Sequence, residues 1–126
     1  MKEYVKKIND STYTVTSFTA MHGLKIAQKL TKIISAIEVR DQGINFSSAV
    51  DKLIDLDSDL SLTLELLSQA LADGVVIERE NFNKIFDDKL GELLELLIFI
   101  VEVNFKDFFY TAQAQGSKIT QAQVAA

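Results

Sequence analysis

The sequence predicts a mainly α-helical domain with a β-hairpin at its N-terminus, and three observations predict it. Apolar residues recur at spacings of three and four along most of the chain, as on one face of a helix. β-Branched and aromatic residues gather instead within residues 3–18, around a cluster of turn formers. The 126 residues include no proline, so no proline interrupts a long helix. This length predicts a single domain, which we place at residues 1–110.

The hairpin is expected over residues 3–18. Residues 9–11, which are asparagine, aspartate and serine, are typical turn formers. Residues 12–18 follow, and there Tyr13 and Val15 share one face of the expected strand. Because a lone hairpin is only marginally stable, it must pack on the helices or pair with another chain.

The clearest helix is expected over residues 19–39. Its apolar stripe consists of Ala20, Leu24, Ala27, Leu30, Ile34 and Ile37. Lys25, Lys29 and Lys32 lie on the opposite side, where they form the hydrated face of the helix or a contact for an acidic partner. Gly23 weakens the helix by about 1 kcal/mol relative to alanine.

A loop around Gly43 is expected over residues 40–47, followed by a short helix capped by Ser47 or Ser48. That helix carries Val50, Leu53 and Ile54. Residues 55–59 alternate aspartate with other residues, a pattern typical of turns and helix caps.

Residues 60–72 fit two patterns, because their leucines alternate as in a strand and also form a helical stripe. Leucine, glutamate, glutamine and alanine favour a helix, which we predict here. Gly74 then fits the helix C-terminus, and residues 75–77 form a brief extended link.

The closing helix is expected from Asp87 to about Phe109, after a helix capped by Asn81 or Asn83. Gly91 marks either a break or a close packing contact. Residues 93–101 are apolar almost all round, so this helix is either central or buried by a partner. Residues 111–126, rich in glutamine, alanine, serine and threonine, predict a flexible polar tail.

Composition excludes several classes of function. The net charge of −5 argues against nucleic-acid binding, which usually needs a basic surface. The longest apolar run, residues 96–101, is far shorter than the roughly 20 residues of a membrane span. Residues 1–4 lead into charge and not into a signal peptide, so we expect a cytoplasmic protein.

No constellation of side chains predicts metal binding. Asp55, Asp57 and Asp59 have the spacing of a calcium loop. Such a loop also needs glycine and glutamate at its sixth and twelfth positions, which here are Leu60 and Leu66. We therefore interpret the aspartates as turn and cap residues.

Catalysis is equally unsupported by the sequence. His22, the single histidine, has no evident orienting partner or nucleophile nearby, and a surface position is the simpler interpretation. Asp87 and Asp88 are more simply explained as a helix terminus than as an acid–base pair. The five scattered glycines form no phosphate loop. We expect no enzyme, cofactor, metal or small-molecule substrate.

Aromatic residues at the end of the closing helix are the most informative feature. Phe105, Phe108, Phe109 and Tyr110 either pack in the core or form a contact surface for another protein. The candidate protein-binding residues are Phe99, Val103, Phe105, Phe108, Phe109, Lys25, Lys29 and Lys32. Because this helix carries more apolar surface than a small domain easily covers, we also expect a homo-oligomer.

Two segments together resemble a known family. The step Gly23-Leu24-Lys25 follows a short strand, and Leu30-Thr31-Lys32-Ile33-Ile34 continues the helix. Residues 93–101 lead into the phrase Val103-Asn104-Phe105-Lys106-Asp107-Phe108-Phe109. In order and spacing, residues 12–110 resemble phage tail assembly chaperones.

The resemblance implies a protein of a phage or prophage that acts in the host bacterial cytoplasm. Such chaperones bind the long, aggregation-prone tape measure protein during tail assembly and leave before the virion is complete. In many phages a frameshifted longer form also recruits tail tube protein. Two alternatives stay open: a structural tail or head–tail connector component, and a helical regulator with an unrelated target.

Overall fold

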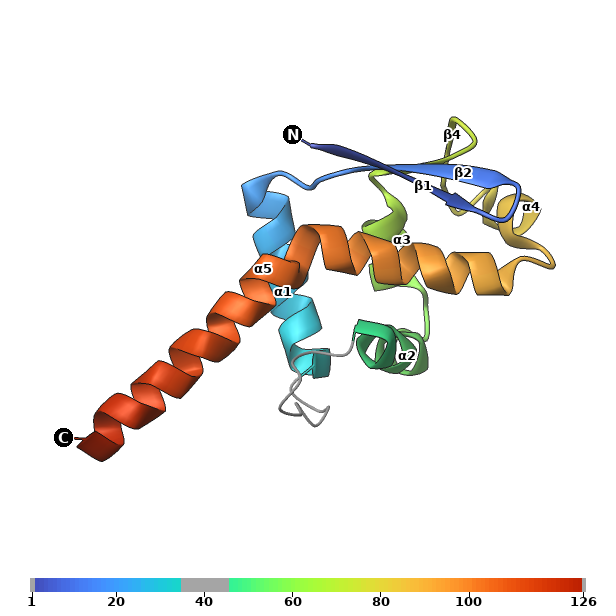
Figure 1. The fold of residues 1–126 in the computed structure, drawn as a ribbon. Coiled ribbons are helices and arrows are strands. Elements are labelled where there is room, and N and C mark those ends of the chain that lie inside the picture. The colour runs from blue at the N-terminus through green and yellow to red at the C-terminus, as the bar shows by residue number, and fades with distance from the viewer. Residues whose placement is uncertain (1, 35–45, 126) are drawn as a thin grey trace.

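The computed structural model describes residues 2–34 and 46–125, and the side chains of residues 2–33 and 46–108. The elements are β1 (Glu3–Ile8), β2 (Ser11–Thr16), α1 (Ala20–Ile34), α2 (Phe46–Leu56), α3 (Ser61–Leu67), β3 (Ala70–Ala72), β4 (Val75–Val76), α4 (Phe82–Phe86) and α5 (Leu90–Ala125). Helices therefore dominate, which confirms the predicted mainly α fold with an N-terminal hairpin (Figure 1).

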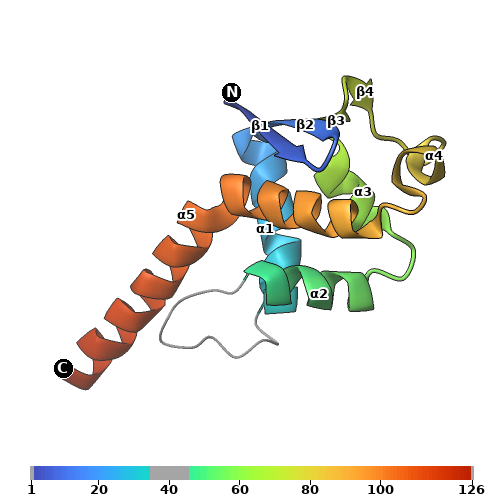
Figure 2. The same ribbon diagram turned by 45° about the vertical axis from the view of Figure 1, so that its right-hand side comes forward.

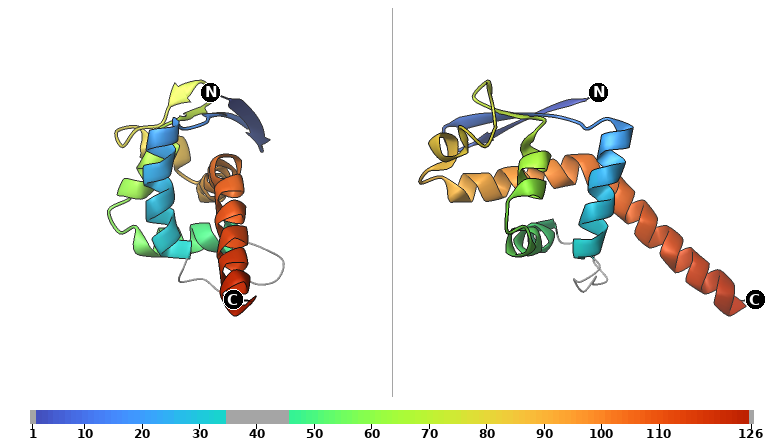
Figure 3. Two further views of the ribbon diagram at one scale, coloured as in Figure 1. Left: turned by 90° about the vertical axis from the view of Figure 1, so that its left-hand side faces the viewer. Right: turned by 180° about the vertical axis from the view of Figure 1, so that it is seen from behind.

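The sheet forms one layer and the helices pack beneath it (Figures 1 and 3). Its antiparallel strands follow the order β1-β2-β3-β4. The predicted hairpin is β1 and β2, in which Tyr4 pairs with Val15 and Ile8 with Ser11. Asn9, with a φ of 53°, adopts the left-handed conformation that a tight two-residue turn requires.

A second hairpin corrects the predicted helix over residues 60–72. The helix α3 ends at Leu67, and β3 pairs with β2, with Val15 opposite Ala70. Asp73 and Gly74 both have positive φ, 49° and 82°, as in a tight hairpin turn. Pairing with the open edge of β2 therefore overrides the helix propensity of these residues, and Gly74 serves a turn and not a helix end.

The aspartates before α3 act as the predicted turn and cap. The Asp57 carboxylate accepts the backbone N–H groups of Leu62 and Thr63 at 3.2 and 2.7 Å. The Asp59 carboxylate accepts the N–H of Ser61 at 3.1 Å. These bonds satisfy donors that the first turn of a helix otherwise leaves unpaired.

The ends of α1 and α2 differ partly from the prediction. The expected end of α1 at residue 39 and most of the expected loop around Gly43 lie outside the described residues. The helix α2 already begins at Phe46, so Ser47 and Ser48 lie inside its first turn and do not precede it. Phe46 is buried on the same helical stripe as Val50 and Leu53, which explains the earlier start.

The link to α5 also differs from the prediction. The side chain of Asn81 does not cap α4. Its NH2 group instead donates to the Val76 carbonyl, and its side-chain oxygen accepts the Glu78 N–H. The helix α5 begins at Leu90 and not at Asp87, because Asp88 has a left-handed φ of 60°. Gly91 lies in the first turn with open space around it, so it marks neither a break nor a close contact.

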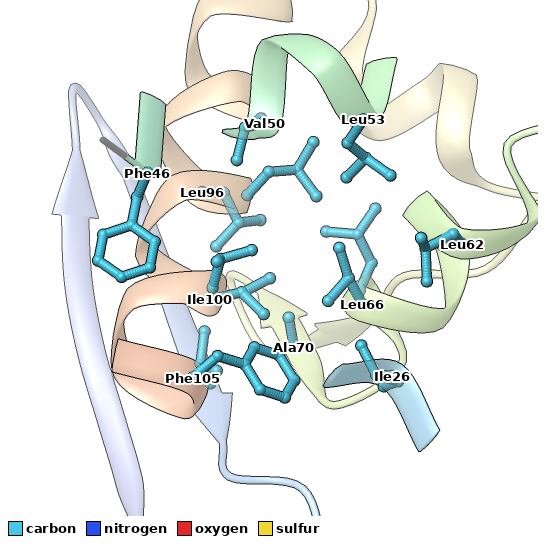
Figure 4. Packing of buried hydrophobic residues seen from close by; sticks show 14 of the residues in the cluster. Ile26, Phe46, Val50, Leu53, Leu62, Leu66, Ala70, Leu96, Ile100 and Phe105 are labelled. Atoms are coloured by element: carbon cyan, nitrogen blue, oxygen red, sulfur yellow. The ribbon is translucent and has the colours of Figure 1, made fainter. Parts of the chain in front are cut away.

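The first half of α5 runs through the centre of the molecule. Its Leu96 and Ile100 are fully buried and face residues of α2 and α3 (Figure 4). Burial inside the domain therefore covers much of the apolar surface of residues 93–101, for which the sequence analysis left open either a central position or burial by a partner.

The second half of α5 leaves the body and continues to Ala125 (Figure 2). The predicted helix end near Phe109 is therefore wrong. Glutamine, alanine and lysine are good helix formers, and no proline stops the helix. The flexibility expected for residues 111–126 stays a prediction.

Candidate protein-binding groove

An apolar groove lies between the start of α1 and the point where α5 leaves the body. It has a volume of about 340 Å³. Its lining residues are Phe18, Thr19, Ala20, Gly23, Leu24, Ala27, Asn104, Phe105 and Phe108. The groove thus combines the stretch that enters α1 with one turn of α5, segments that are about eighty residues apart in the sequence.

Asn104 fixes the two walls of the groove to each other. Its side-chain oxygen accepts the backbone N–H of Phe18 at 3.0 Å, and its amide donates to the Ile100 carbonyl at 3.0 Å. The rings of Phe18 and Phe105 stack, with centroids 6.0 Å apart. The backbone N–H of Phe18, in the link between β2 and α1, is thereby paired away from solvent.

The wall formed by α1 is one helical face. Residues 20, 23, 24 and 27 follow the spacing of neighbouring turns. Leu24, which belongs to the predicted apolar stripe of this helix, is 52% exposed. Gly23 leaves room in the wall, because a Cβ there would first meet the Cβ of Phe18 at 3.5 Å, an ordinary contact distance.

A charged cluster lies behind the groove wall. The ring of His22 packs edge-on against Phe18, with centroids 4.9 Å apart, and its Nε2 lies 3.2 Å from a Glu65 oxygen. Lys29 Nζ donates to the other Glu65 oxygen at 2.8 Å. Partial burial acts to raise the pKa of Glu65, but Lys29 and then His22 outweigh it and leave that pKa below its usual value.

The predicted protein-binding residues fall on several surfaces. Phe105 is 3% exposed and Phe108 is 39% exposed, and both line the groove. Phe99 lies elsewhere, beneath β1, where its ring meets Tyr4 edge-on at 6.5 Å. Val103 is half-buried against the core.

The remaining predicted residues do not join the groove. Lys25, Lys29 and Lys32 are exposed on α1, and Lys29 pairs with Glu65. The side chain of Phe109 lies outside the described residues.

Phe18, Leu24 and Asn104 are groove residues that the sequence analysis did not select. All three lie inside residues 12–110, whose order and spacing resemble a known family. That resemblance was the available signal for them, because no local pattern shows that residues 18–27 and 104–108 meet.

Other kinds of site are not evident in the described part of the chain. No group of three or more potential metal ligands occurs among those residues. Among the helices described, none combines the length and apolar character that crossing a membrane demands.

Comparison with known proteins identifies a family for most of the chain. Residues 9–118 match the sequence model of the family described as phage tail assembly chaperone protein, TAC. The match includes both segments that line the groove. Neither the comparison with curated proteins nor that with solved structures finds a match. The family match covers most of the sequence, and the chain therefore belongs to the phage tail assembly chaperone family.

Proposed function

We propose that this protein is a non-catalytic chaperone that binds an apolar helical segment of the tape measure protein in the groove between α1 and α5. One observation carries the proposal: residues 18–27 and 104–108, which both lie inside the stretch that matches the family, meet at an apolar groove that opens to solvent. Helix-in-groove recognition places one apolar face of a helix into such a site.

The residues around the groove suit a reversible contact. Leu24 and Phe108 line it with partly exposed side chains, and the exposed Met21 lies one residue beyond the lining Ala20. Complete burial of a leucine or phenylalanine side chain is worth about 1.5–3 kcal/mol. Association consumes much of such a gain, so a small groove gives binding that can be released when the tail tube displaces the chaperone.

Solubility of the complex follows from mass action and charge. A long helical protein with an exposed apolar seam aggregates, and covering that seam favours the dispersed form. The net charge of −5 on each chaperone adds repulsion between complexes. We place this activity in the cytoplasm of the host bacterium, and no catalytic step is required.

Co-expression with the tape measure protein of the same phage tests the groove. Leu24→Asp places a charge in the apolar lining, so we expect the tape measure protein to become insoluble and to be lost from a pull-down. The matched control is Leu90→Asp, at an exposed leucine in the first turn of α5 at the other end of the domain. An acidic residue is favoured there by the helix dipole, and client binding should be unchanged. Equal binding by both variants would remove the groove from the proposal.

A structural role in the tail or the head–tail connector is the alternative. A structural component stays in the particle, whereas an assembly chaperone leaves it. Mass spectrometry of purified virions should therefore detect tape measure and tube proteins but not this chain. Its presence at a stoichiometric level would favour the structural role.

A further inference from the structure

We propose that β1 is a self-association edge: two copies pair their β1 strands antiparallel about a two-fold axis at Val5 and join their sheets into one. The partner is a second copy of this chain. The proposal does not rest on client binding, because no residue of β1 lines the groove.

The sheet order leaves one side of β1 without a strand among the described residues (Figure 3). In an antiparallel pair, every second residue directs both backbone groups to its neighbour. The Lys2 carbonyl accepts the Ser17 N–H at 2.9 Å, so Lys2, and with it Tyr4, Lys6 and Ile8, faces β2. Glu3, Val5 and Lys7 consequently direct their N–H and C=O groups towards the open edge.

The axis at Val5 is selected by charge. It places Val5 opposite Val5 and Glu3 opposite Lys7 of the second copy, in both directions, so each outward backbone group gains a partner. An axis at Tyr4 would instead oppose Lys2 and Lys6, and an axis at Lys6 would oppose Lys6 with itself. Opposite charges in directly facing positions stabilise a strand pair, and like charges weaken it.

The side chains on the outer face suit this pairing. Glu3, Val5 and Lys7 are exposed, and Val5 is 63% exposed. A lysine on an edge strand ordinarily discourages pairing with other chains. Here the two-fold axis gives that lysine a carboxylate partner, so the same residues favour one specific partner.

On the inner face of β1, side chains pack against α5 and line a second hollow. Tyr4 meets Phe99 edge-on, and Lys6 Nζ lies 5.3 Å from the centre of that ring. Lys6 and Phe99, with Ile98 and the carboxylates Glu95 and Glu102, line a hollow of about 250 Å³. In the pair, Tyr4 lies opposite Lys6 of the second copy, whose ammonium group then comes near these carboxylates. This position also gives Phe99 a place at a protein contact.

Sedimentation equilibrium of the full chain over a range of concentrations tests the pairing, with a dimer expected for the natural sequence. Val5→Pro removes an N–H that points away from β2, so the hairpin can keep its own bonds. Because both copies carry the change, it deletes the two symmetry-related bonds at the two-fold axis, and we expect the dimer Kd to rise at least about tenfold. Circular dichroism checks that the variant remains folded.

A charge exchange gives the sharper test. Glu3→Lys alone opposes lysine with lysine, and Lys7→Glu alone opposes glutamate with glutamate, so each should raise the Kd roughly tenfold. Mixing the two variants, or combining both changes in one chain, restores opposite charges and should restore dimers. Lys89→Glu is the matched control for Lys7→Glu, because it makes the same charge change at an exposed residue outside β1. It should leave the dimer Kd unchanged.

Three results would overturn the proposal. The first is a monomer at every concentration. The second is a dimer that tolerates Val5→Pro and both single charge changes. The third is a dimer that is lost in Leu24→Asp but not in Val5→Pro, because it would place self-association in the groove.

Discussion

The buried side chains of Tyr13 and Glu92 join the sheet to α5 by a hydrogen bond. The Tyr13 hydroxyl donates to a Glu92 oxygen at 3.0 Å, and its ring stacks on Phe86 with centroids 6.4 Å apart. Burial, and then the bond to Glu92, raises the pKa of Tyr13 to about 12. The pair therefore couples the first turn of α5 to the centre of the sheet.

Tyr13→Phe should destabilise the protein by about 1–3 kcal/mol, because it leaves a buried carboxylate without this donor. Urea unfolding at pH 7 measures the change. Tyr4→Phe, at the half-buried tyrosine of the edge strand, is the matched control and should cost less. An equal loss of unfolding free energy in the two variants would show that the buried hydrogen bond does not contribute to stability beyond what the hydroxyl of Tyr4 does.

The pH dependence of unfolding tests the same pair by another route. Because the pKa of Tyr13 is about 12 in the folded protein and 10.0 for an ordinary tyrosine, folding favours the protonated phenol. Its contribution is fully present below pH 10 and is lost as the pH rises through 12. Natural protein should lose more stability across this window than Tyr13→Phe does. The same loss of stability with pH in both proteins would contradict the raised pKa of Tyr13.

Two glycines should respond oppositely to alanine. Gly23 lies inside α1 with room for a Cβ, so Gly23→Ala should stabilise by about 0.4–1 kcal/mol. Gly74 has a φ of 82°, so Gly74→Ala should destabilise by about 1 kcal/mol. Thermal unfolding measures both, and a loss of stability in Gly23→Ala would mean that the groove wall is tighter than described.

At the scale of elements, the sequence predicted those helices and strands that residues close together in the chain determine. The β1–β2 hairpin and α1 follow from turn residues and a helical stripe within each segment. The β3 strand could not be predicted in this way. Residues 60–72 carry helix-forming side chains, and only the edge of β2, more than fifty residues away, draws Ala70–Ala72 into the sheet.

The groove shows the same limit. Its phenylalanines on α5 were selected from their clustering, and Phe105 and Phe108 do lie in it. Leu24 belonged to the predicted apolar stripe, but periodicity shows only which side of a helix is apolar. It does not show how much of that side the neighbouring elements cover. The contact between Phe18 and Asn104 is tertiary, and a single sequence gives no direct sign of it.

Asn104→Ala should loosen the groove, because the Phe18 N–H loses its acceptor. We expect a stability loss of about 1 kcal/mol and weaker binding of the tape measure protein. Asn83→Ala, at an exposed asparagine of α4, is the control for both measurements. Calorimetry and urea unfolding together give the result; unchanged binding would show that Asn104 does not organise the site.

At the scale of the whole molecule, one helix serves three regions. The first half of α5 fills the core, its middle supplies Asn104, Phe105 and Phe108 to the groove, and its end projects from the body (Figure 2). The edge of β1 is a separate surface, because none of its residues lines the groove. The proposed client binding and the proposed self-association should therefore be separable by mutation, and a dimer would offer two grooves to one long client.

Radical footprinting of side chains, with and without the tape measure protein, tests the central claim most directly. If the groove holds the client, labelling of the lining residues Leu24 and Phe108, and of the adjacent Met21, should fall in the complex. Labelling of Leu56 and Leu90, which are exposed outside the groove, should stay the same. Unchanged labelling at the groove, with protection at Leu56 or Leu90, would contradict the account.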